Sequence, residues 1–146
     1  MKFEPIKIEL QSQWMKIYPY SLCLDDIFFR VRNSDGDLLY ELLLTTHQFE
    51  NIIDVFFENF RNLNKESLIY KYFDRDFIGN NEDYAIGIEE NFDATEFLQM
   101  LVNINSKIFE NENIHNEYLK NAYNELMEIC KYSIRNETQI FVITEG

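Results

Sequence analysis

The sequence predicts an α+β protein with a mostly antiparallel sheet and about three helices packed on it. This prediction depends on strand-like segments at both ends of the chain, a hairpin turn at 35–36 and helical periodicity in three later segments. The predicted order is three strands, a helix, two strands, two helices and a strand, without the regular alternation of parallel α/β sheets. Residues 1–146, 46% of them hydrophobic, suit a single globular domain.

Three strands are expected before residue 46. Residues 3–10 (FEPIKIEL) alternate weakly, and Pro5, which has no N–H to donate, favours an edge position. Residues 12–24 are ambiguous between strand and turn. Residues 26–45 predict a hairpin, because Asp35-Gly36 supplies the turn chemistry between two apolar runs. The nearly continuous apolar run at 38–44 predicts a central strand.

The first predicted helix begins after Thr45 and ends near residues 62–64. Thr45 and Gln48 have the spacing of a capping box, in which each side chain binds the backbone N–H of the other residue. Its apolar positions recur at helical spacing. These positions are Phe49, Ile52, Ile53, Phe56, Phe57 and Phe60.

The second half of the chain predicts two strands at 67–73 and 84–90, two helices and a last strand at 138–146. Asp93 is the expected N-cap of the second helix. The apolar face of that helix comprises Phe97, Leu98, Leu101, Ile104 and Ile108, and that of the third comprises Leu119, Ala122, Tyr123, Leu126, Ile129 and Cys130. Because no strand separates these two helices, they are expected to pair as an αα-hairpin.

Acidic charge is the strongest functional signal in the sequence. The net charge is −13, and residues 73–96 contain eight acidic side chains against the single base Arg75. Glu50, Asp54 and Glu58 also follow one another at intervals of four along the first helix, where like charges cost about 0.2–0.5 kcal/mol per pair. Such a field repels nucleic acid and anionic membranes and attracts basic proteins.

The sequence contains no recognisable catalytic, cofactor or metal motif. Cys23 and Cys130 have no CxxC or Cys/His context and are expected to be free thiols, and His47 and His115 have no metal-ligand spacing. The acidic loop at 74–85 has Ile78 and Ala85 where a calcium loop needs oxygen ligands. We therefore expect a non-enzymatic protein without cofactor or metal. Without an apolar leader or spanning segment, it is expected to be cytoplasmic.

A small, acidic, Phe- and Tyr-rich single domain without catalytic motifs resembles the immunity proteins that bacteria carry against polymorphic or contact-dependent toxins. The resemblance covers the overall character of the chain and depends on no diagnostic motif. It implies an inhibitor that occludes the active site of a cognate toxin, often a basic nuclease. A surface of carboxylates would fit the positive groove with which a nuclease holds phosphates.

The predicted partner-binding residues are those of the acidic stretch and of the neighbouring helix flank. They are Asp74, Asp76, Glu82, Asp83, Tyr84, Glu89, Glu90, Asp93, Glu50, Asp54 and Glu58. Three alternatives share the same sequence features. The first alternative is a nucleic-acid-mimicking decoy in anti-defence or regulation. The second is a homo-oligomeric structural subunit whose acidic surface only keeps it soluble. The third is a small-molecule enzyme with a deep polar pocket.

Overall fold

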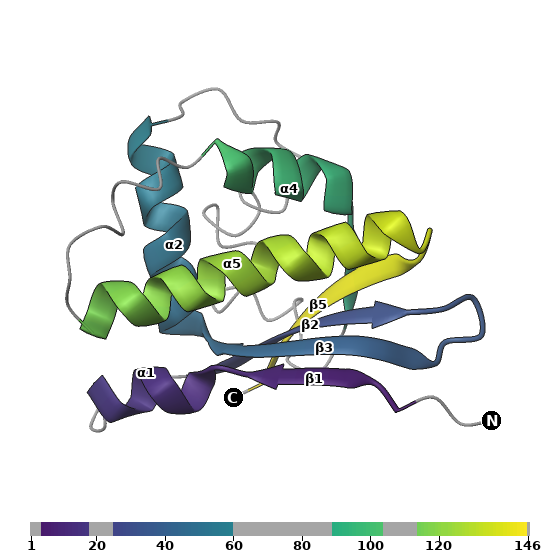
Figure 1. Ribbon diagram of the computed structural model, residues 1–146, viewed down its shortest axis with the longest axis horizontal. Helices are drawn as coiled ribbons and strands as arrows, with labels where there is room; N and C mark the ends of the chain where they lie inside the picture. Colours follow the sequence, from purple (N-terminus) through teal and green to yellow (C-terminus); the bar gives the residue numbers. More distant parts are fainter. Residues whose placement is uncertain (1–3, 18–24, 60–88, 104–113, 146) are drawn as a thin grey trace, which may run out of the picture.

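The computed structural model describes residues 4–17, 25–59, 89–103 and 114–145, with their side chains except at 53–59, 114–115 and 145. These ranges form one five-stranded sheet and four helices (Figure 1). The strands are β1 (Ile6–Glu9), β2 (Asp26–Arg32), β3 (Leu38–Thr45), β4 (Glu90–Phe92) and β5 (Gln139–Glu145). The helices are α1 (Gln11–Ile17), α2 (Thr46–Asn59), α4 (Ala94–Val102) and α5 (Ile114–Arg135).

The sheet has the strand order β1-β3-β2-β5-β4. β2 pairs antiparallel with β3 and β5, β4 pairs antiparallel with β5, and β1 pairs parallel with β3. The predicted α+β class and mostly antiparallel sheet are therefore confirmed, with one parallel pair. β1 is an edge strand, as Pro5 indicated, and β3 lies inside the sheet.

The predicted hairpin turn joins β2 to β3. The side-chain Oδ1 of Asn33 accepts hydrogen bonds from the backbone N–H groups of Asp35 (3.0 Å) and Asp37 (2.9 Å). Gly36 has φ +85°, a left-handed conformation that glycine adopts without a steric penalty. The register then aligns Phe29 of β2 with Leu42 of β3, so that both side chains face the same side of the sheet.

Helices α2, α4 and α5 lie on one face of the sheet, and the core fills the space between them and the strands (Figure 1). β2 alternates between fully buried and partly exposed residues, so that Ile27, Phe29 and Val31 face the helices. The ring of Phe29 contacts the rings of Phe49 on α2 and Phe97 on α4 at centroid distances of 5.2 and 6.3 Å. This aromatic contact joins three elements.

The helix predictions are confirmed wherever the structure describes them. The backbone N–H of Gln48 donates to Thr45 Oγ1 at 3.0 Å, and Gln48 Oε1 accepts from the Thr45 N–H at 3.4 Å, which forms the predicted capping box. All six predicted apolar positions of α5 are buried. Phe49, Ile52, Phe97 and Leu101 are also buried, whereas the predicted core positions Phe60, Ile104 and Ile108 lie outside the described residues.

Two local expectations differ from the structure. The segment left ambiguous at 12–24 lies in helix α1 as far as residue 17, where Trp14 is fully buried and its indole N–H donates to His47 Nδ1 at 2.9 Å. A helix of seven residues is too short for apolar periodicity to reveal it. The strand expected at 84–90 shares only Glu90 with β4, which ends at Phe92, and the ring of Phe92 contacts Phe29 and Phe97. Residues 67–73 and 84–88 lie outside the described ranges.

Replacing Phe29 tests whether the aromatic contact holds the core together. Phe29→Ala should lower the free energy of unfolding by about 3–5 kcal/mol, because it leaves a cavity among the rings of Phe49, Phe92 and Phe97. Phe28→Ala is the matched control, since the neighbouring side chain points to the opposite face and is partly exposed. Urea unfolding measures both. An equal or larger loss for Phe28→Ala would contradict the assignment of the two faces.

Candidate functional site

The face of the sheet opposite the helices carries an arginine cluster, which comprises Arg30, Arg32, Glu41 and Glu89. Arg32 donates two hydrogen bonds to the carboxylate of Glu89, from Nε at 3.0 Å and from Nη2 at 2.7 Å. Arg30 donates to Glu89 at 2.9 Å and to Glu41 at 2.8 Å, and its guanidinium lies 4.5 Å above the ring centre of Phe28. Two positive and two negative groups therefore neutralise one another.

The arginine cluster ties the start of β4 to β2. Glu89 directly precedes β4, and β5 separates β4 from β2 in the sheet, so the Glu89 side chain reaches across β5. Hydrogen bonds from Arg32 lower the pKa of Glu89 below its ordinary value near 4.5, partial burial opposes this, and Arg30 reinforces it. Glu89, which the sequence assigned to partner contact, is thus neutralised within the fold.

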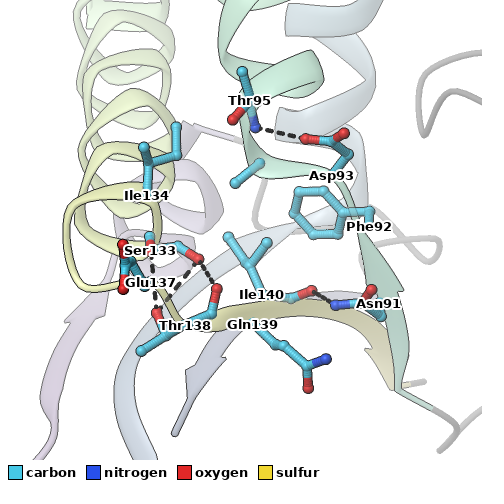
Figure 2. A pocket seen from close by; sticks show the side chains of 11 residues that line it. Asn91, Phe92, Asp93, Thr95, Ser133, Ile134, Glu137, Thr138, Gln139 and Ile140 are labelled. Atoms are coloured by element: carbon cyan, nitrogen blue, oxygen red, sulfur yellow. Dashed lines mark hydrogen bonds between the residues drawn. The ribbon is translucent and has the colours of Figure 1, made fainter.

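A second feature, the corner groove, lies between the β4–α4 junction and the turn from α5 to β5 (Figure 2). Its volume is about 340 Å³. It is lined by Asn91, Phe92, Asp93, Ala94, Thr95, Ser133, Ile134, Glu137, Thr138, Gln139 and Ile140. These residues include two carboxylates and no lysine or arginine, so the groove is acidic.

Asp93 reaches the corner groove because it caps α4. Its Oδ1 accepts hydrogen bonds from the backbone N–H groups of Thr95 (2.9 Å) and Glu96 (3.2 Å). The predicted N-cap is therefore confirmed. The cap fixes the carboxylate at the helix N-terminus, where the partial positive charge of the helix favours an anion.

Glu137 reaches the corner groove because it terminates α5 in a left-handed conformation, with φ 52°. The backbone N–H of Thr138 bonds to Ser133 O at 3.0 Å and that of Glu137 bonds to Ile134 O at 3.2 Å, which is the Schellman pattern. Ser133 Oγ also donates to Thr138 O at 2.9 Å. Glycine usually occupies this position, so Glu137 holds its carboxylate there at a steric cost.

The sequence did not single out Glu137 or its neighbours Ser133, Ile134 and Thr138. Glu137 lies far from Asp93 in the chain, and the two segments come together through the antiparallel pairing of β4 with β5 and the packing of α4 against α5. A weak signal existed, because α5 gives way to a strand within four residues without a glycine to stop it. That arrangement forces another residue into the terminating conformation.

The remaining predicted contact residues are dispersed. Glu90 is half-buried on β4, and Glu50 is exposed on α2. Asp54 and Glu58 lie on α2 at positions whose side chains are not described. Asp74, Asp76, Glu82, Asp83 and Tyr84 lie outside the described residues. Of the predicted residues whose side chains the structure describes, the corner groove contains Asp93 alone.

In the described part of the chain, no group of three or more His, Cys, Asp or Glu side chains gathers to hold a metal ion. Cys130 is fully buried, and burial raises the pKa of its thiol to about 12, which makes it a poor nucleophile. None of the described helices has the length and apolar content to span a bilayer. Comparison of the chain with protein-family models, curated proteins and solved structures gave no match.

Glu89→Gln tests the arginine cluster. The variant should lose about 1–3 kcal/mol of unfolding free energy at neutral pH, since it removes charged hydrogen bonds from two arginines. Because the pKa of Glu89 is lower in the folded state, Glu89 of the unfolded chain takes up its proton at a higher pH than Glu89 of the folded chain. This stabilisation is therefore present above about pH 5 and is lost as the pH falls through the folded-state pKa.

Urea unfolding at a series of pH values from about 3 to 7 measures both effects. The dependence of unfolding free energy on pH should be shallower in Glu89→Gln than in the native chain. Glu50→Gln, at an exposed position on α2, is the control for loss of a carboxylate and should change stability by less than about 0.5 kcal/mol at neutral pH. Parallel pH curves for the native chain and Glu89→Gln would contradict the role of the cluster.

Glu137→Gly tests the conformational cost at the end of α5. Glycine should raise the free energy of unfolding by about 0.5–1 kcal/mol, because relief of the left-handed strain exceeds the added entropy of the unfolded chain. Glu128→Gly, at an exposed position inside the same helix, should instead lower it by about 1 kcal/mol. Thermal unfolding of the two variants gives the comparison, and a destabilising Glu137→Gly would refute the strain.

Proposed function

We propose that this chain binds a basic protein and neutralises it, as immunity proteins do when they occlude the active site of a cognate toxin. The observation that carries the proposal is the acidic corner groove, which is lined by Asp93 and Glu137 and, among the described residues, by no basic side chain. The net charge of −13 gives the same sign to the molecule as a whole.

The arginine cluster supports this proposal because it neutralises two positive charges within the fold. Arg30 and Arg32 lie on the central strand, where unpaired cations would oppose the acidic field. Their charges are instead satisfied by Glu41 and Glu89. The exposed acids Glu50, Asp93 and Glu137 are therefore not offset by these two arginines.

A basic toxin that acts on nucleic acid must present lysine and arginine to phosphates. A rigid acidic surface competes for the same side chains without being a substrate. Opposite fields can raise association rates to about 10⁸–10⁹ M⁻¹s⁻¹ at low salt, which suits an inhibitor that must act before the toxin does. Charge then governs speed and orientation, and desolvated contacts at the centre of the interface govern the lifetime of the complex.

Affinity capture from the native host at low salt, with elution by a salt gradient and identification by mass spectrometry, tests the function. We expect one basic partner at near-equal stoichiometry, whose association slows about tenfold or more when Glu82 and Asp83 are both changed to Lys. Circular dichroism verifies that this variant folds.

Two outcomes would overturn the proposal. Capture of no basic partner, or only of further copies of this chain, would assign the acidic surface to solubility and favour a structural subunit. Association rates that do not depend on salt would show that charge does not govern the encounter. Unchanged kinetics for the doubly reversed variant would remove Glu82 and Asp83 from the interface.

A further inference from the structure

The corner groove combines two kinds of surface. Phe92, Ala94 and Ile140 give it an apolar floor, while Asp93 and Glu137 stand on opposite sides in Figure 2. Ile134 adds an apolar edge, because 41% of its surface is exposed. A ligand that fits both surfaces needs an apolar stem and a positively charged end.

The two carboxylates retain capacity for a ligand. Asp93 uses Oδ1 to cap α4, which leaves Oδ2 available to accept a further hydrogen bond. Among the described side chains, none donates a hydrogen bond to the carboxylate of Glu137, which is exposed. The helix cap fixes the carboxylate of Asp93, whereas the end of α5 fixes only the backbone of Glu137, whose side chain becomes ordered on binding.

The volume of the corner groove limits the size of the ligand. At about 340 Å³ it lies near the lower end of small-molecule sites, which span roughly 300–1,000 Å³. This space suits one long side chain and is too small for a folded segment. Arginine fits best, since its planar guanidinium can bind carboxylates with several N–H groups at once and can lie against an aromatic ring such as Phe92.

We propose that the corner groove binds a single arginine side chain of the protein partner, with the guanidinium between Asp93 and Glu137 and the aliphatic stem over Phe92 and Ile140. This inference rests on the proposed function and names the anchor of that interface. The site differs from the loop at 74–85 that the sequence emphasised, because it is built from the β4–α4 junction and the α5–β5 turn.

The test is a titration of the full-length, ¹⁵N-labelled chain with Nα-acetyl-arginine amide, followed by amide chemical shifts. We expect saturable shifts at residues 91–95 and 133–140, with a dissociation constant of roughly 1–10 mM for so small a probe. Nα-acetyl-citrulline amide, which has nearly the same shape without the charge, should produce no saturable shifts.

Asp93→Asn combined with Glu137→Gln removes both charges. Asparagine keeps the helix cap, so α4 should remain folded. This double variant should weaken binding of the arginine probe between about twofold and thirtyfold, the range expected for two partly exposed ion pairs. Glu50→Gln is the matched control, because it removes an exposed carboxylate on another element and should leave the affinity unchanged.

Each other outcome decides against part of the proposal. Equal binding of citrulline, or full affinity in the double variant, would overturn the site. Equal binding of Nα-acetyl-lysine amide would overturn the choice of arginine. A basic partner that is captured equally well by the native chain and by the double variant would refute the groove and leave the proposed function standing. Saturable binding of the arginine probe, together with capture of no basic partner, would refute the proposed function and leave the groove as an arginine site.

Discussion

Phe29 joins most of the described core through one aromatic ring. It lies fully buried on the central strand and contacts Phe49 of α2, Phe97 of α4 and Phe92 of β4. These contacts come from three elements, of which β4 and α4 follow directly on one another, and the position of each element depends on the same ring. The packing of Phe92 and Phe97 against Phe29 therefore fixes the position of the β4–α4 junction, which includes Asp93. Packing energy of this kind, about 1.5–3 kcal/mol per buried apolar side chain, far exceeds the cost of nearby like charges.

The two faces of the sheet carry different side chains. The face toward the helices is almost entirely apolar, whereas the opposite face holds the arginine cluster together with the buried side chains of Leu43 and Ile143. Glu89 connects the two, since it draws the start of β4 toward β2 while Phe92 packs against the core. A carboxylate from the acidic stretch is thereby committed to the fold. Among the described residues, the exposed carboxylates of Asp93 and Glu137 form no ion pair with an arginine.

The two carboxylates of the corner groove differ in their effect on stability. Glycine at position 137 would end α5 without strain, yet it would remove one of the two carboxylates of the groove. Asp93 shows no such conflict, because the same carboxylate caps a helix and faces the groove. The groove therefore takes one carboxylate from a stabilising helix cap and the other from a strained helix end.

The sequence by itself determined the class of the fold, most of the elements and the sign of the charge. The Asp35-Gly36 turn, the Thr45–Gln48 capping box, the Asp93 cap and the buried stripe of α5 are all local patterns, so they were readable without a structure. The structure alone decided that Trp14 lies in a short helix, that Glu89 is paired, and that Glu137 shares a groove with Asp93. Each of these depends on contacts between residues distant in the chain, and such contacts are set by strand order and packing, which local periodicity does not encode.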